Sequence, residues 1–275
     1  MSFSIKTNIS SLSAQQSLNI NEREKQKLFA KLSSGSRITS AQDDAAGLAI
    51  AVDLESQVTS DAQAVRNGDD ALNISDTADA ALGQAGDILG QLRELAVASG
   101  SGALNDQQRG DLQRQASALT SELDRIAGGT EYNGTSLLNG GGSLGFQVGT
   151  GSNPATNQIN ITPGNVTTAA LGLSNLDVST QQNAQSALAG IDGALQVLSS
   201  TRASLGAEAN RASSAIDTAT SRGISLAAAH SRIADADIAQ QASDLTKNLI
   251  LGQAGVAVLA QANQHNQAAL RLLNA

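Results

Sequence analysis

The chain has 275 residues, enough for one or two domains with a sizeable core. Aromatic residues make up only 1% of it, and it contains two prolines and no cysteine, which excludes disulfide frameworks and thiolate metal sites. A core with so few rings must be filled by Ala, Leu, Ile and Val. Because Ala and Leu are strong helix formers, the composition predicts long packed helices.

The net charge of −8 argues against a nucleic-acid partner, since phosphate binding needs clustered Lys and Arg. Residues 1–42 and 233–275 together sum to +3, which leaves −11 for residues 43–232. We interpret the acidic middle as the solvated part and the near-neutral ends as the packed part. No apolar run approaches a membrane span, and residues 1–12 lack the apolar block of a secretory signal peptide, so we expect no membrane partner and no ordinary secretion signal.

The first expected helix, from Ile9 to Leu32, has sparse apolar residues that drift around its surface. These residues are Ile9, Leu12, Leu18, Ile20, Leu28, Phe29 and Leu32. After Ser40, Asp43 and Asp44 open an Ala-rich helix. Their charges either complement the helix dipole or form ion pairs between subunits, and the sequence does not separate these readings.

Three further segments, residues 74–95, 112–126 and 188–216, repeat apolar residues at alternating steps of three and four, which favours coiled-coil packing. Arg202 interrupts the last of them, either as a snorkelling side chain or as a buried ion pair with an acid across the bundle. Short sequence signals mark the expected helix ends. Gly100 and Gly102 end one helix, the run from Asn105 to Gln108 can cap the start of the next, and Gly128 and Gly129 end that second helix.

Between the helices, residues 132–180 are rich in Gly, Asn, Thr and Ser. Leu144, Phe146 and Val148 alternate there, as do Ile159 and Ile161, which predicts a β-hairpin. Helical rhythm returns near Gln181, so its partner helices must precede residue 130. The expected fold is mainly α: a long antiparallel helical bundle or coiled coil with a small β-hairpin and both termini at one end.

From Asp235 to Asn274 one helix would run ~60 Å. Its 3-4 rhythm comprises Leu245, Leu249, Gly252, Val256, Leu259, Asn263, Asn266, Leu270 and Leu273. Each buried Leu or Ile is worth roughly 1.5–3 kcal/mol, against roughly 1–2 kcal/mol of backbone entropy per ordered residue. A lone pair of terminal helices is therefore marginal, and we expect the two ends to become ordered when copies of the chain stack against them.

Several stretches at the two ends form a recognisable set. They are IKTNISSLSAQQSLN (5–19), LSSGSRITSAQDDAAGLAIA (32–51), SRIADADIA (231–239) and QAGVAVLAQANQ (253–264). Together with LRELAV (92–97) and LGAEANR (205–211), they resemble bacterial flagellin, the subunit of the flagellar filament. The resemblance covers nearly the whole chain.

The resemblance implies an antiparallel coiled coil of residues 1–42 and 233–275 that lines the filament's inner channel, and an outer helical rod of residues 43–232. It implies a secreted helical homopolymer, exported unfolded by the flagellar type III apparatus, with an export chaperone, a cap and hook-junction proteins as partners and no cofactor or metal. The assembly residues expected on this basis are Ile9, Leu12, Leu28, Leu32, Asp43, Asp44, Leu245, Leu249, Val256, Leu259, Leu270 and Leu273.

The chain departs from the family pattern at a few positions. Asn266 stands where the family has Pro, which removes a helix kink. The resemblance also implies an innate-immune receptor that reads an Arg near Leu95 and a Glu on the following helix. Here these positions are Gln91 and Gln115, so we expect weak receptor activation.

Alternative functions rank lower. A hook–filament junction protein shares the terminal signatures, and a secreted coiled-coil adhesin or translocator shares the helical rhythm. An enzyme ranks last: residues 141–145 match the G-x-S-x-G nucleophile elbow, but that elbow needs a strand before it and a helix after it, whereas here an expected strand follows.

Overall fold

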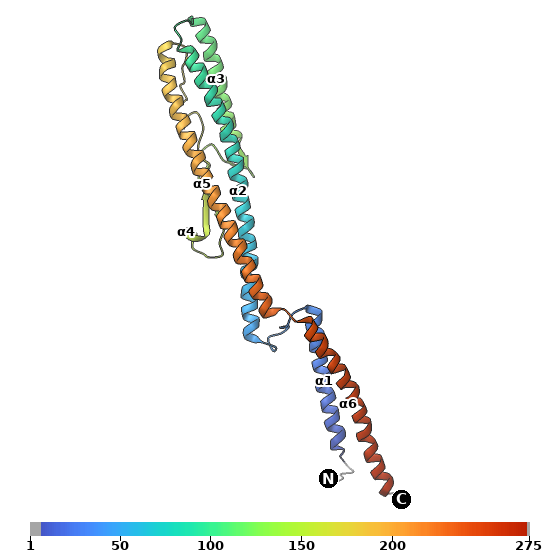
Figure 1. Cartoon of the computed structure of the whole chain (residues 1–275). Helices are drawn as coiled ribbons and strands as arrows, with labels where there is room; N and C mark the ends of the chain where they lie inside the picture. Colours follow the sequence, from blue (N-terminus) through green and yellow to red (C-terminus); the bar gives the residue numbers. More distant parts are fainter. Residues whose placement is uncertain (1–6, 274–275) are drawn as a thin grey trace. The chain divides into compact units, whose positions relative to one another are not determined.

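The computed structural model describes residues 7–273, with side chains for residues 7–265. Its helices are α1 (Ile9–Ser34), α2 (Ala45–Ser99), α3 (Asp106–Gly129), α4 (Pro154–Asn157), α5 (Gln181–Ala234) and α6 (Ile238–Leu273). Its strands are β1 (Glu131–Tyr132), β2 (Thr135–Ser136), β3 (Leu144–Gln147) and β4 (Gln158–Ile161) (Figure 1). The expected fold class, mainly α with a small β-hairpin, is confirmed.

The chain divides into two compact units, which are described separately. The terminal unit comprises residues 1–56 and 225–275, and the outer unit comprises residues 57–224. Among the described residues, no helix combines the length and apolarity that a membrane crossing requires, and no group of three or more acidic or His side chains is placed to hold a metal ion.

The outer unit has a continuous apolar core built from α2, α3, α5 and the segment between α3 and α5. The core-facing residues of α2 include the expected 3-4 series, from Ile74 and Ala78 to Ile88 and Leu92, all buried. Four more residues of α2 that lie outside the predicted 3-4 repeat are also buried in this core: Ala71, Leu82, Leu89 and Ala96. The apolar stripe of α2 is therefore wider than a two-position coiled-coil seam, because α2 packs against partners on more than one side.

Helix boundaries in the outer unit follow the local sequence signals. α2 ends at Ser99, just before Gly100. α3 begins with a capping box, in which the Asn105 side chain accepts from the Gln108 backbone N–H and the Gln108 side chain accepts from the Asn105 backbone N–H, at 2.9 and 3.0 Å. α5 begins at Gln181. Since each signal acts within one turn of chain, the sequence alone located these ends.

Two short antiparallel hairpins occupy the segment between α3 and α5. The alternation predicted the β3–β4 hairpin, and the structure adds its register, which pairs Leu144 with Ile161 and Phe146 with Ile159. The β1–β2 hairpin turns through Asn133 and Gly134, both at positive φ. An Asn-Gly pair is favoured there because a two-residue hairpin turn needs left-handed backbone at both positions. Ile159 and Ile161 are buried against the helical core, so β4 is held by packing as well as by its four-residue ladder.

Three ion pairs cross between α2 and α5 in the outer unit, joining Asp61 to Arg222, Asp79 to Arg202, and Arg93 to Asp192. As the residue number rises along α2 it falls along α5, so the two helices are antiparallel. Arg202 uses both Nε and Nη2 to bind the Asp79 carboxylate, at 2.8 and 2.9 Å. Its interruption of the apolar series is therefore an ion pair, and a half-exposed one rather than a buried one.

Candidate assembly interface

In the terminal unit, α1 and α6 form an antiparallel pair. The Asn8 side chain donates to the Ala262 carbonyl at 3.0 Å, and Asn21 donates to Asn248 Oδ1 at 3.0 Å. At the other end, Ser36 and Asp235 form a β-bridge. The described start of α1 therefore lies beside the C-terminal half of α6, and the two described chain ends lie at the same end of this unit.

The face between the two helices is made largely of small and polar residues. On α1 the seam includes the buried or half-buried Ser11, Ala14, Leu18, Asn21, Lys25, Leu28 and Leu32. On α6 it includes Leu245, Asn248, Gly252, Gly255, Leu259 and Ala262. Both series step by three and four, which is the spacing of a coiled-coil seam. The buried-side Asn pair, Asn21 with Asn248, fixes the register in the way that polar seam residues do in coiled coils.

Two glycines of α6 let the helices approach closely. A Cβ at Gly255 would lie 2.8 Å from Leu18 Cδ2, and one at Gly252 would lie 3.3 Å from Asn21 Oδ1. Both distances are shorter than ordinary van der Waals contact, so the close approach of α1 and α6 depends on the missing side chains. The seam therefore gains little hydrophobic burial, because close backbone contact replaces large apolar side chains.

The large apolar side chains of this unit are exposed instead. Those of α1 are Ile9, Leu12, Ile20 and Phe29, and those of α6 are Ile238, Leu249, Ile250, Leu251, Val256 and Val258. Ile9 is 70% exposed and Val256 58%. Soluble monomers rarely expose so many large apolar residues on neighbouring elements, and such surfaces mark interaction sites. The terminal unit thus exposes ten large apolar residues on its two long helices, while five leucines are half-buried in the seam beside small and polar residues.

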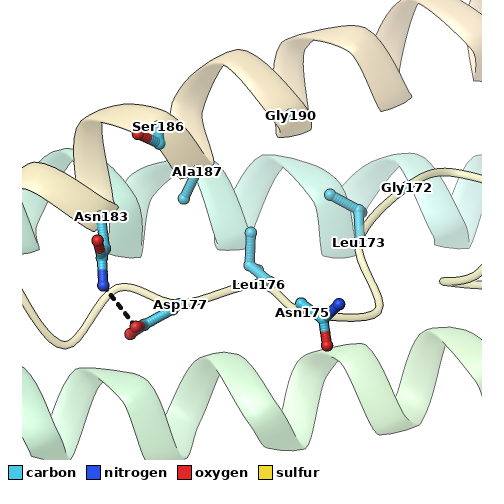
Figure 2. A pocket seen from close by; sticks show the side chains of 9 residues that line it. All are labelled: Gly172, Leu173, Asn175, Leu176, Asp177, Asn183, Ser186, Ala187 and Gly190. Carbon is cyan, nitrogen blue, oxygen red and sulfur yellow. Dashed lines mark hydrogen bonds between the residues drawn. The ribbon is translucent and has the colours of Figure 1, made fainter.

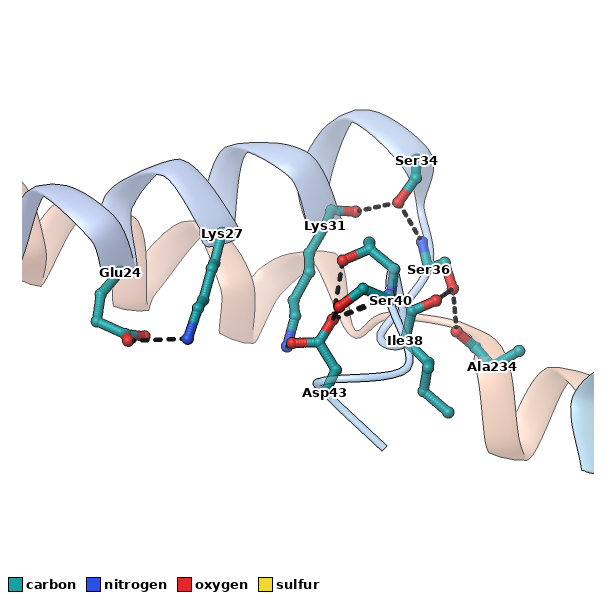
Figure 3. A network of polar contacts seen from close by, with 10 residues as sticks. Glu24, Lys27, Lys31, Ser34, Ser36, Ile38, Ser40, Asp43 and Ala234 are labelled. Atoms are coloured by element: carbon teal, nitrogen blue, oxygen red, sulfur yellow. Dashed lines mark hydrogen bonds and ion pairs between the residues drawn. The ribbon is translucent and has the colours of Figure 1, made fainter. Parts of the chain in front are cut away.

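A polar loop follows α1 in the same unit (Figure 3). Gly35 ends α1 in the left-handed conformation with a φ of 69°. The Asp43 carboxylate accepts hydrogen bonds from the backbone N–H and the hydroxyl of both Thr39 and Ser40, and it lies 3.8 Å from the Lys31 ammonium. The Thr39 hydrogen bonds, with the Lys31 charge, hold the pKa of Asp43 below its ordinary value of 3.8.

Asp44 caps the start of α2, since its Oδ1 accepts from the Gly47 N–H at 2.8 Å. Both aspartates thus have partners within their own chain. Ser36 links the loop to the end of α5, because its hydroxyl lies 2.8 Å from the Ile38 carbonyl and 2.9 Å from the Ala234 carbonyl. This loop is a rigid connection held by its own side chains.

The expected assembly residues fall into three groups. Ile9, Leu12, Leu249 and Val256 are exposed, whereas Leu28, Leu32, Leu245 and Leu259 are half-buried in the α1–α6 seam. The side chains of Leu270 and Leu273 lie outside the described residues, as does that of Asn266. The rhythm of α6 did not separate the seam from the exposed side, because α6 carries apolar residues on more than one side. The Gly252–Gly255 pair was the signal that would have identified the seam.

The residues that the resemblance places at the innate-immune receptor contact, Gln91, Leu95 and Gln115, lie in the outer unit. Gln91 and Gln115 are exposed on α2 and α3, and Leu95 is half-buried. Their exposure leaves them accessible, but nothing in the described residues assigns them a partner.

A pocket of about 370 Å³ lies between residues 172–177 and the first turns of α5 (Figure 2). Its carboxylate, Asp177, accepts from the Ser179 N–H at 2.7 Å and from the Asn183 amide at 2.5 Å. The Ser179 hydrogen bonds hold the pKa of Asp177 below its ordinary value. The carboxylate thus stabilises the turn that leads into α5.

Comparisons with known proteins agree with one another. Residues 5–142 match the model of the bacterial flagellin N-terminal helical region, and residues 188–273 match that of the bacterial flagellin C-terminal helical region. The chain is 37% identical over 270 residues to a flagellin of Halalkalibacterium halodurans, covering 98% of this chain and 99% of the relative. It is 38% identical over 304 residues to a flagellin of Bacillus subtilis, with the same coverage.

Among solved structures, the chain resembles the crystal structure of Bacillus cereus flagellin, with a TM-score of 0.51 and 29% identity over 60% of this chain and 94% of that one. It also resembles a putative flagellar hook-associated protein from Vibrio parahaemolyticus, with a TM-score of 0.59, covering 70% of this chain and all of that one. At 13% identity the second likeness concerns the fold alone.

Proposed function

The chain belongs to the bacterial flagellin family and is a structural subunit of the filament that drives swimming motility, and from this premise we propose that its terminal helices drive polymerisation. In this proposal residues 1–42 and 233–275 line the inner part of the filament, and residues 43–232 form its outer rod. The proposed core segments lie within the terminal unit.

The main support for this proposal is that ten large apolar side chains of the α1–α6 pair are exposed, whereas the seam between the two helices combines half-buried leucines with small and polar residues. Fully burying a large apolar side chain is worth roughly 1.5–3 kcal/mol, so covering ten side chains that are about half exposed represents a gain of the same order as the stability of a typical domain. That gain is available only when neighbouring copies cover them.

The distribution of these residues also fits a polymer better than a closed dimer. Leu249, Ile250 and Leu251 are consecutive on α6 and all exposed, so they point in three directions about 100° apart. A single flat partner surface covers one such direction. Several copies packed around the pair, related by a heterologous contact that does not close, cover all three.

The finer partners of this function are proposed from the family resemblance, and the exposed apolar surface supports the need for them. We infer that α6 needs a chaperone to shield its apolar residues before export, that export uses the flagellar type III apparatus, and that cap and hook-junction proteins contact the same terminal helices. The expected assembly residues, including Asp43 and Asp44, remain predictions, since both aspartates have intrachain partners that a neighbouring subunit would have to compete with.

Seeded polymerisation followed by electron microscopy tests the proposed function. The full chain should extend filament seeds, whereas a chain lacking residues 236–275 should not, while circular dichroism of the truncated chain still shows the helical outer unit. Filaments built from the truncated chain would contradict the proposal.

Receptor activation is expected to be weak, because amides at Gln91 and Gln115 cannot form the charged contacts that an Arg and a Glu would offer. A receptor-reporter cell assay should show a low response that rises when Gln91→Arg and Gln115→Glu are combined. A strong response to the unaltered chain would refute this expectation.

A further inference from the structure

An open cleft of about 360 Å³ lies in the outer unit, between α5 and the segment that joins β3 to β4. Its floor is apolar: Val148, Ile159 and Ala219 are buried there. Its rim is polar and carries two arginines of α5, Arg211 and Arg222. The cleft is separate from the terminal helices and from the pocket of Figure 2.

One wall of the cleft is a single face of α5. Arg211, Ala215, Thr218 and Arg222 follow one another at steps of four, three and four, which places them along one side of a helix. The two guanidinium groups are therefore on the same side of α5, three turns apart, with a hydroxyl between them.

The opposite wall is held in place by its own hydrogen bonds. The Asn157 carbonyl accepts from the backbone N–H of Val148 and of Gly149, at 2.8 and 3.1 Å, and the Asn157 side chain accepts from the Gly151 N–H at 3.0 Å. The Gln147 amide donates to the carbonyls of Gly149 and Gly151, at 2.7 and 2.8 Å. Such bracing means that an occupant need not order this loop when it enters, which lowers the entropic cost of binding.

The two arginines differ in their charge balance. Arg222 binds the Asp61 carboxylate, whose side chain is only 2% exposed, so its charge is compensated within the chain. Arg211 is exposed and, among the described residues, forms neither an ion pair nor a hydrogen bond. The nearest acid along α5, Glu208, accepts from the Thr162 N–H at 2.8 Å instead. Arg211 therefore offers the cleft a guanidinium with all its donors available.

The rest of the outer unit supplies the complementary charge. Residues 57–224 contain sixteen acidic and eight basic residues, whereas the terminal unit is neutral, with nine of each. Several exposed carboxylates, among them Asp69, Asp76 and Glu94, have no ion pair or hydrogen bond within the described part of the chain. Copies of this unit brought side by side repel one another unless acid on one copy meets base on the next.

We propose that the Arg211 cleft receives an acidic side chain from the outer unit of a second copy of the chain. This inference rests on the proposed function, because only a polymer brings the outer units together. A carboxylate that enters the cleft pairs with Arg211 while its neighbours cover the apolar floor, and the cleft has room for both. The contact counters the repulsion between acidic units and makes assembly sensitive to ionic strength.

The test compares Arg211→Gln with Arg66→Gln in the full chain. Arg66 is an exposed arginine of the same unit, bound only to the Gln63 side chain, so both variants lose one positive charge. The critical concentration for growth on filament seeds is measured by sedimentation at low and at high ionic strength. Arg211→Gln should raise it about fivefold at low ionic strength and less at high, and Arg66→Gln should leave it unchanged.

Two further variants identify the contact. Arg211→Lys keeps the charge but loses the planar fork, and should give an intermediate value. Arg211→Glu should polymerise worse than Arg211→Gln, because it places a like charge against the incoming carboxylate. Because Arg211 forms no ion pair or hydrogen bond among the described residues, circular dichroism of all the variants should match the unaltered chain.

The outcomes are distinct. Equal critical concentrations for Arg211→Gln and Arg66→Gln at both ionic strengths would overturn the proposal while filaments still form. Saturable binding of inorganic phosphate to the monomer, with normal polymerisation of Arg211→Gln, would identify a free-anion site and overturn it as well. A chain that forms no filaments at all would instead contradict the proposed function.

Discussion

The two units of this chain use apolar residues in opposite ways. In the outer unit, leucines such as Leu82, Leu89 and Leu92 are fully buried among three helices and the hairpin segment. In the terminal unit, Leu249 and Leu251 are about half exposed on a two-helix pair whose seam contains Gly252 and Gly255. The same residue type is therefore core in one unit and surface in the other.

This difference in burial indicates that the two units gain their stability from different contacts. A domain persists when its burial exceeds the conformational entropy lost on folding. Three helices around a common core can achieve that within one chain, whereas two helices in contact along a narrow seam of small residues gain little. We therefore propose that the outer unit folds within one chain and that the terminal pair gains most of its stability on assembly.

The largest expected difference between the two units comes from making the same Leu→Ala substitution in each. Leu82→Ala should lower the free energy of unfolding of the monomer by about 2–5 kcal/mol, because it opens a cavity in a closed core. Leu251→Ala, at a side chain 50% exposed, should cost less than about 1 kcal/mol. Urea unfolding followed by circular dichroism measures both, and equal losses would mean that the terminal pair has a core of its own.

A smaller effect is expected at the turn between α2 and α3. Arg109 is buried and donates to the carbonyls of Ser99, Ser101 and Leu104, the last two at 2.9 and 3.1 Å. Arg109→Met leaves these acceptors without their donor and should cost about 2 kcal/mol.

Arg114→Met is the control for that change, since Arg114 is exposed and pairs only with Asp111, one turn away on the same helix. It should change the free energy of unfolding by less than about 0.5 kcal/mol. If the two variants unfold at the same urea concentration, Arg109 does not hold this turn.

The cross-helix pairs of the outer unit should contribute less again. Hydrogen bonds from Arg202 hold the pKa of Asp79 below its ordinary value of 3.8. A depressed pKa stabilises the fold above pH 3.8, and that contribution is lost as the pH falls through the folded-state value. Because the pair is half exposed, Asp79→Asn should cost under about 1 kcal/mol at pH 6, and this cost should vanish in acid. A cost that persists at pH 2 would indicate a packing defect instead.

The exposed residues of α6 should also contribute little to the monomer. Leu249→Ser combined with Val256→Ser should change the free energy of unfolding of the monomer by about 1 kcal/mol or less, since both side chains are exposed. In seeded polymerisation the same variant should raise the critical concentration at least about tenfold, because each side chain would lose burial against a neighbouring copy. Gln253→Ser, between the two positions, should polymerise normally. Normal filaments from the double variant would remove α6 from the interface.

Local features of this fold could be predicted from the sequence. The capping box at Asn105 and Gln108, the end of α2 at Gly100 and the existence of the β3–β4 hairpin depend on residues within a turn of one another or on simple alternation. Hydrophobic period and cap chemistry act over such short distances, so they identify the elements without a tertiary model. The paired terminal motifs likewise identified the family.

Longer-range features needed the tertiary structure. The 3-4 rhythm of α6 predicted one stripe containing Leu245, Leu249 and Val256, yet only the first of these lies in the seam with α1. A helix that is apolar on several sides has more than one possible contact face, and the close approach at Gly255 selects among them.

The helices, the β3–β4 hairpin and the family could therefore be predicted from the sequence alone, because each depends on patterns within short stretches of the chain. The tertiary structure decided which charges meet. Asp61 and Arg222 are 161 positions apart, and Arg211 is left without a partner because α2 and α5 pair in one register and no other. Register depends on every contact along two long helices at once, so no short stretch of sequence contains it.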